Sequence, residues 1–164
     1  MSSAIDGTVN DSQKPMTSHR RTQGIVPRRS LTVADWSLLA RVAAMQLATT
    51  VIVRIVPLRV VRTFAARLAR LMLVAAPVEE AKVVWAIEAT GRRMGRLSTC
   101  LVKAVVAEAM LSSSVRSIRF TIGVKRIADG SLRAHAWVAS ENGVLIGATS
   151  EDYVRLVELS GTSA

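Results

Sequence analysis

Two side chains of this sequence have the chemistry of a nucleophile and its base, Cys100 and His135. The 164 residues include one cysteine and two histidines, and the other histidine, His19, lies in a polar N-terminal segment. A cysteine nucleophile needs an imidazole within hydrogen-bond reach, which takes the thiol proton and later protonates the leaving amine. Cys100 and His135 could therefore form a thiolate–imidazolium pair for acyl transfer. A structural cysteine and a half-buried histidine are the alternative interpretation.

The same residue count excludes other kinds of site. One cysteine cannot form a disulfide within the chain, and so few Cys and His side chains cannot supply the three or four such ligands of a zinc site. We therefore expect no metal and no cofactor. The N-terminal segment holds no apolar run of signal-peptide length, and a free thiol suits a reducing compartment. We expect a cytoplasmic protein.

The cysteine stands at the expected start of a helix. Hydroxyl side chains precede Cys100 and an apolar run follows it, which predicts a capped helix over residues 100–111. Amide N–H groups and the positive end of the helix dipole stabilise a thiolate in the first turn, which raises the fraction of nucleophile at neutral pH. Ala104 and Ala107 share the face of Cys100, so we expect this face to pack inward, with the thiol at the buried tip of the helix.

The histidine lies in a region where the apolar period changes from 3.6 to 2. We expect strands over residues 118–124, 132–140 and 144–149. Asp-Gly at 129–130 and Asn-Gly at 142–143 predict tight turns between them, and so an antiparallel three-stranded sheet. His135 and Trp137 share one face of the middle strand, and the returning third strand brings Thr149 roughly opposite His135.

Helical periodicity precedes the cysteine helix. A first helix begins at Thr32, which forms a capping pattern with Asp35, and it stops or kinks at Pro57. A third helix covers residues 78–90, with Gly91 just past its end. The expected inward residues of the first helix are Trp36, Leu39, Val42 and Met45.

The second helix, between Pro57 and Pro77, has the clearest pattern, because its apolar and cationic residues separate onto opposite sides. Its expected core face consists of Val61, Phe64, Leu68, Leu71 and Met72. The opposite side carries Arg59, Arg62 and Arg70. These arginines form either a solvated face or a contact surface for an acidic peptide.

The chain is strongly basic, with 22 Lys and Arg against 12 Asp and Glu and a net charge of +10. Such a charge favours a polyanion, an acidic peptide or an anionic membrane surface as partner. Aromatic residues make up only 4% and offer few stacking platforms, so we expect no nucleic acid partner. The longest charge-free stretch of the helical region, residues 42–53, is too short to span a bilayer, whereas peripheral membrane contact stays open.

The length and the apolar content of 50% indicate one domain with a sizeable core. Residues 1–30 are rich in Ser, Thr, Gln, Gly and Arg, which predicts a flexible basic tail. Residues 31–164 predict a single domain. Within it we expect a helical part over 31–95, followed by the cysteine helix and the sheet over 96–164.

Five segments together resemble the transglutaminase-like leader peptidases of lasso-peptide biosynthesis, in their stand-alone form. They are Ser98-Thr99-Cys100-Leu101-Val102-Lys103-Ala104, Gly123-Val124-Lys125-Arg126, Asp129-Gly130, Ala134-His135-Ala136-Trp137-Val138 and Val144-Leu145-Ile146-Gly147. The resemblance implies an α+β fold with N-terminal helices and a papain-like or transglutaminase-like core. It also implies a Cys-His-Asp protease that cuts a precursor between leader and core. A separate leader-binding protein and an ATP-dependent macrolactam cyclase are the implied partners.

In this resemblance Cys100 is the nucleophile and His135 is the general base and acid. The orienting acid of the family is expected soon after the Ile-Gly pair, but this chain has Ala148 there. Asp152 is our predicted third member, and Glu151 or Thr149 are the alternatives. The backbone N–H of Cys100 is a natural oxyanion donor.

Two further functions compete with the peptidase. A transglutaminase-type acyltransferase would use the same pair and pass the acyl group to an amine instead of water. A non-catalytic basic protein that binds a partner or a membrane surface would need neither side chain. Within the peptidase hypothesis, we expect the Arg-rich helix and the tail to contact the leader or its recognition protein.

Overall fold

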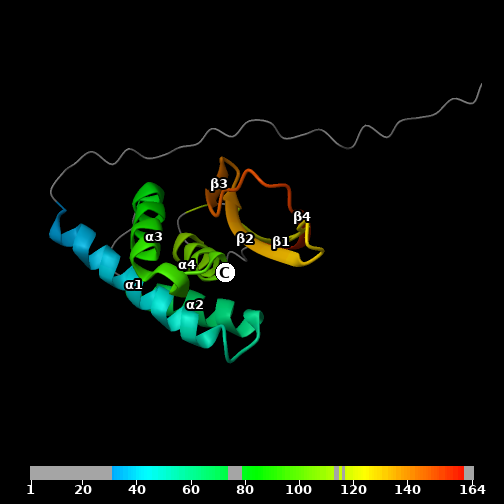
Figure 1. The fold of residues 1–164 in the computed structure, drawn as a ribbon. Coiled ribbons are helices and arrows are strands. Elements are labelled where there is room, and N and C mark those ends of the chain that lie inside the picture. The colour runs from blue at the N-terminus through cyan, green and yellow to red at the C-terminus, as the bar shows by residue number, and fades with distance from the viewer. Residues whose placement is uncertain (1–30, 74–78, 113–114, 116, 161–164) are drawn as a thin grey trace, which may run out of the picture.

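The protein is described here by a computed structural model that covers residues 31–73, 79–112, 115 and 117–160, so the predicted tail lies outside the described residues. In these described residues, four α-helices precede a four-stranded antiparallel sheet, which confirms the predicted α+β fold (Figure 1). The helices are α1 (Val33–Ile52), α2 (Leu58–Leu73), α3 (Glu80–Met94) and α4 (Cys100–Leu111), with a short 3-10 helix (Gly95–Leu97) before α4. The strands are β1 (Arg119–Arg126), β2 (Leu132–Ser140), β3 (Gly143–Ile146) and β4 (Val154–Ser160).

The sheet has one strand more than the sequence pattern predicted. The strand order is β3-β2-β1-β4, so β4 pairs with β1 across a long connection. The pairing of β4 with β1 shifts register at Gly123. The apolar residues of β4 therefore do not alternate with the regular period of 2 that indicates a strand, and the sequence pattern did not predict β4. The third strand is shorter than predicted and ends at Ile146, because Gly147 takes a positive φ of 80° that turns the chain away.

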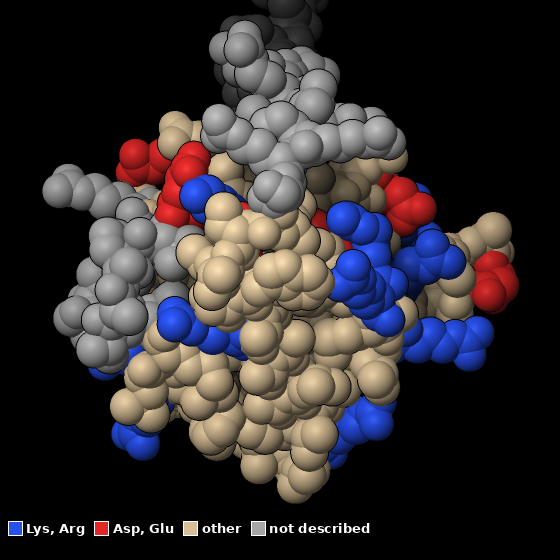
Figure 2. Space-filling model, turned by 90° about the vertical axis from the view of Figure 1, so that its left-hand side faces the viewer, with Lys and Arg blue, Asp and Glu red and all other residues tan. Residues whose placement is uncertain are grey.

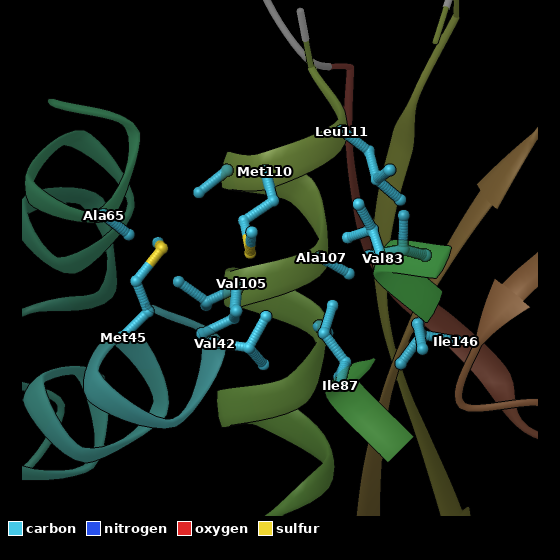
Figure 3. Close-up of a cluster of buried hydrophobic side chains, with 14 of the residues drawn as sticks. Val42, Met45, Ala65, Val83, Ile87, Val105, Ala107, Met110, Leu111 and Ile146 are labelled. Atoms are coloured by element: carbon cyan, nitrogen blue, oxygen red, sulfur yellow. The ribbon is translucent and has the colours of Figure 1, made fainter. Parts of the chain in front are cut away.

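The core lies on both sides of α4, which is the central helix of the fold. It packs against α1, α2 and α3 on one side and against the sheet on the other. Figure 3 shows apolar side chains from all these elements meeting around α4. The buried residues labelled there are Val42, Met45, Ala65, Val83, Ile87, Val105, Ala107, Met110, Leu111 and Ile146. The cysteine therefore begins a helix that is held from both layers.

Helix α1 begins as predicted, with Thr32 and Asp35 forming a reciprocal capping box. Its predicted inward residues are buried except for Trp36, which is exposed. That part of the prediction was wrong because the apolar arc of α1 is wider than the stripe that touches α3 and α4. None of the described helices is long and apolar enough to cross a membrane.

Helix α2 buries a narrower stripe than predicted. Its fully buried side chains are Val61, Ala65 and Ala69, whereas Phe64 and Leu71 are exposed. Small alanines let α2 approach its neighbours closely, and residues spaced by four along one line make that contact. The assignment of Phe64 and Leu71 to the core was therefore wrong.

Arg62 does not lie on a solvated face with the other arginines of α2. Its guanidinium pairs with the buried Glu108 of α4, with Nε donating to Oε2 at 2.8 Å. The same guanidinium lies 5.3 Å from the centre of the Phe120 ring. The hydrogen bond to Glu108 raises the pKa of Arg62 against the opposing effect of burial. The expected cationic face of α2 is thus reduced by one arginine, which instead joins α2 to α4.

Helix α3 runs through Gly91 to Met94 and does not end at Thr90 as predicted. A Cβ on Gly91 would lie 2.7 Å from Cε of Lys103 and 3.0 Å from Oγ of Ser98. Gly91 therefore lets α3 lie close to Ser98 and to Lys103 of α4, and it does not end the helix.

Candidate active site

Cys100 is the first residue of α4, as the sequence predicted. The Thr99 side chain caps the helix by accepting a hydrogen bond from the Val102 N–H at 3.3 Å. Ala104 and Ala107 are buried, but Cys100 itself is half-buried and not fully enclosed as expected. The N–H groups of Cys100 and Leu101 have no acceptor within the helix. They are thus available to a negatively charged oxygen beside the thiol.

A buried polar network holds the segment that leads into Cys100. Ser98 Oγ donates to Gln46 Oε1 at 2.9 Å, and Gln46 Nε2 donates to the Ile87 carbonyl and to Thr90 Oγ1 at 3.0 Å each. Thr50 Oγ1 also donates to the Leu97 carbonyl, at 2.9 Å. This network was not predicted. Its signal in the sequence is the pair of polar residues, 46 and 50, on the inward side of an apolar helix.

His135 lies in β2, and its orientation is determined by a backbone carbonyl. Its Nε2 is 2.8 Å from the Gly147 carbonyl oxygen. A carbonyl can only accept, so this hydrogen bond requires the proton on Nε2 and leaves Nδ1 with its lone pair. The ring is thus in the tautomer that a general base needs, with Nδ1 as the basic atom.

Aromatic rings enclose the imidazole. The Trp137 ring is stacked on His135 with centres 6.1 Å apart, and the Tyr153 ring is tilted against it at 5.3 Å. A Cβ on Gly123 would lie 2.9 Å from the Trp137 ring and from Tyr153 Cβ. Gly123 of β1 is therefore required for these rings to approach the sheet. The predicted shared face of His135 and Trp137 is confirmed by their stacking.

A pocket of about 430 Å³ brings Cys100 and His135 together. It is lined by Glu88, Ser98, Cys100, Lys103, His135, Leu145, Ile146, Gly147 and Ala148. Lys103 Nζ and Glu88 Oε2 form an ion pair in its wall at 2.9 Å. Within the described part of the chain, no hydrogen bond joins the Cys100 thiol to the His135 ring. Catalytic hydrogen bonds are often long without substrate and shorten when it binds.

None of the three candidate orienting residues is a hydrogen-bond partner of His135 in the described structure. Asp152 is exposed and is not among the residues that line the pocket. Thr149 Oγ1 accepts the Glu151 N–H at 3.2 Å, and Glu151 Oε2 accepts the Tyr153 hydroxyl at 2.9 Å. This hydroxyl lowers the pKa of Glu151, with Lys125 as a further cause. The group that accepts the hydrogen bond from His135 Nε2 is the backbone carbonyl of Gly147, which a pattern of side chains in the sequence cannot indicate.

The described residues hold no cluster of three His, Cys, Asp or Glu side chains placed to bind a metal ion. The pocket brings together a thiol, an imidazole and the backbone N–H groups at the start of α4. Together these can form and break an acyl–sulfur bond.

A cysteine at the start of a central helix, with a histidine on the adjoining antiparallel sheet, is the arrangement of a papain-like core. Residues 37–159 match the transglutaminase-like superfamily, and the chain belongs to this superfamily. Its members include cysteine proteases and acyltransferases. No curated protein and no solved structure gives a significant match to the chain.

Proposed function

We propose that this protein is a cysteine peptidase that removes the leader from a lasso-peptide precursor. The observation that carries the proposal is the pocket in which Cys100, at the start of α4, meets His135, whose Nε2 is hydrogen-bonded to the Gly147 carbonyl. The segments that resemble the lasso leader peptidases contribute most of the residues that line this pocket. Superfamily membership supports acyl chemistry on the cysteine.

In the first half of the reaction, bound substrate brings the thiol against Nδ1 of His135. The imidazole takes the thiol proton, and the sulfur attacks the carbonyl carbon of the bond between leader and core. The N–H groups of Cys100 and Leu101 donate to the resulting oxyanion. Collapse breaks the carbon–nitrogen bond, and the core amine leaves with the proton from the imidazolium. The leader is then held as a thioester on Cys100.

In the second half, water replaces the core amine. His135 takes a proton from the attacking water, and the tetrahedral intermediate expels the sulfur, which is protonated again. The products are a leader with a free carboxylate and a core with a free N-terminal amine. That amine is the group from which a separate ATP-dependent cyclase makes a macrolactam. Delivery of the leader by a separate recognition protein is part of the proposal.

Two groups are proposed to orient the imidazole during these steps. The Gly147 carbonyl already binds Nε2, but it is neutral and stabilises an imidazolium less than a carboxylate does. Asp152 lies on the segment that follows, and it would have to approach the ring when substrate binds. Asp152→Asn leaves peptide cleavage unchanged if the carbonyl suffices, and slows it if the carboxylate takes part.

The test combines the full chain, a lasso-peptide precursor and a leader-recognition protein in water labelled with heavy oxygen. The wild type should yield a core of unchanged mass and a leader carrying the label, whereas Cys100→Ala should yield neither. Ser112→Ala is a matched truncation at the other end of α4, where the hydroxyl bonds the Ala109 carbonyl at 3.3 Å, and it should cleave normally.

Different products would contradict this proposal in different ways. A cross-linked precursor that has lost ammonia would identify the acyltransferase alternative, which uses the same two side chains. Intact precursor with wild-type protein, in the presence of the recognition protein and with circular dichroism showing a folded chain, would exclude the peptidase. The non-catalytic basic binding protein would then be the better explanation.

A further inference from the structure

A stripe of apolar side chains runs along the outward side of α1. Its large exposed side chains are Val33, Trp36, Leu47 and Val51, with exposed fractions between 50% and 86%, and Ala40 and Ala44 lie between them. These positions are spaced by three or four residues, so they form one stripe on the helix surface. With 20 residues, α1 presents this stripe over about 30 Å. No contact within the described chain covers it.

Helix α2 and the turn before it also carry exposed apolar side chains. Ile55 lies in the turn, and the exposed side chains of α2 are Val60, Phe64 and Leu71. Trp36, Phe64 and Leu71 are the residues that periodicity assigned to the core. Large apolar side chains that leave the core and gather on one helical hairpin indicate an interaction surface. We call the exposed apolar residues of α1, α2 and their turn the hairpin surface.

The charges around the hairpin surface have one sign. From residue 36 to residue 73 the chain has arginines but no Asp or Glu. Arg54, Arg59, Arg67 and Arg70 are exposed, and none of them is among the ion pairs of the described chain. Figure 2, which views the side on which α1 begins, shows a broad uncharged area bordered by Lys and Arg, with Asp and Glu confined to its upper half.

We propose that the hairpin surface docks onto an anionic phospholipid bilayer, with α1 lying in the plane of the interface. The apolar side chains would enter the boundary of the acyl chains, and Trp36 suits the headgroup level. The arginines would extend their guanidinium groups to the lipid phosphates. A second copy of the chain is a poorer occupant, because it would bring one set of unpaired arginines against another.

The test is co-flotation of the full chain with vesicles of phosphatidylcholine mixed with phosphatidylglycerol, compared with phosphatidylcholine alone. The variant carries Val51→Ser, Ile55→Ser and Leu71→Ser, whose side chains are 59% to 76% exposed, so folding should not depend on them. The matched control carries Leu132→Ser, Val154→Ser and Leu156→Ser on the sheet, where the exposed fractions are 65% to 73%. Both triple variants keep the basic residues of the N-terminal segment.

We expect the wild type to bind the anionic vesicles, and to bind less as salt is added. The hairpin variant should lose at least about tenfold in partitioning, while the sheet control stays within about twofold. Equal binding by wild type and hairpin variant, an equal loss in the sheet control or no binding to anionic vesicles would overturn the proposal. The proposal would also be overturned if the wild type did not bind vesicles but formed a concentration-dependent dimer that the hairpin variant abolishes. None of these outcomes depends on peptidase activity.

Discussion

Replacing Gly147 with alanine tests whether this glycine is required for the geometry around His135. Gly147 has a φ of 80°, where an alanine costs about 1 kcal/mol. Its Cβ would also lie 2.7 Å from the Ala136 carbonyl oxygen and 3.1 Å from Trp137 Cβ. Because the nearest atom belongs to the backbone, relief needs a movement of the chain, and overpacking of this kind costs about 1–3 kcal/mol. The expected loss of stability is therefore about 2–4 kcal/mol.

Gly130→Ala is the matched control for this substitution. Gly130 has a φ of 84°, close to that of Gly147, but no atom lies within 4 Å of the added Cβ. It should cost only the conformational part, about 1 kcal/mol. Urea unfolding of the two variants measures the difference, which isolates the steric contact. Equal losses in the two variants would refute the reasoning.

The same pair of variants has a readout at the candidate site. The chain has a single cysteine, so alkylation by iodoacetamide, followed by mass spectrometry, reports Cys100 alone. Gly147→Ala moves the carbonyl that binds His135 Nε2, and alkylation at neutral pH should slow several-fold. Gly130→Ala should react like the wild type. A Gly147→Ala protein that is destabilised but reacts normally would show that the carbonyl does not position the imidazole.

Three further predictions concern the base, the buried ion pair and the segment before β4. His135→Ala should slow alkylation of the single thiol at neutral pH by about tenfold. An unchanged rate would show that His135 does not activate the Cys100 thiol. Glu108→Ala should lower the free energy of unfolding by about 2–3 kcal/mol, because Arg62 is left charged with its side chain only 20% exposed. The double variant Arg62→Met with Glu108→Leu should recover most of that loss in urea unfolding, and a further loss would contradict this explanation. Tyr153→Phe removes the main cause that lowers the pKa of Glu151, so this pKa should rise toward its ordinary value in an NMR titration. A carboxyl group with a lowered pKa stabilises the fold at pH values above its ordinary pKa, and this stabilisation is lost as the pH falls. The free energy of unfolding of the variant should therefore differ most from that of the wild type at neutral pH and least in acid.

Local signals predicted the parts of the fold that are determined by neighbouring residues. The start of α4 at Cys100 was confirmed because a hydroxyl cap and the following apolar run are both within a few residues. The turn between β1 and β2 was also confirmed, since Gly130 takes the positive φ that Asp-Gly favours. The alternation along β2 placed His135 and Trp137 on one face, where their rings stack.

Features that depend on distant contacts were missed. Which part of the apolar arc of α1 is buried depends on where α3 and α4 pack, so Trp36 was misassigned. The pairing of β4 with β1 joins strands that are separated in sequence by β2 and β3, so no local sequence pattern indicates it. The Gly147 acceptor is a backbone atom, and the sequence shows only side chains. The role of Gly91 was missed for the same reason, because it depends on a contact with Lys103 on another helix.

The central position of α4 connects the candidate chemistry to the cooperativity of the domain. Nearly every residue after Lys103 in this helix is buried, between the other helices on one side and the sheet on the other. Amide hydrogens in such a helix exchange with solvent only when the whole domain opens. Local fraying elsewhere would leave Cys100 in place, whereas separation of the two layers would remove the helix that carries it. Loss of thiol reactivity and loss of secondary structure should therefore follow one denaturation curve, without a folded but inactive intermediate.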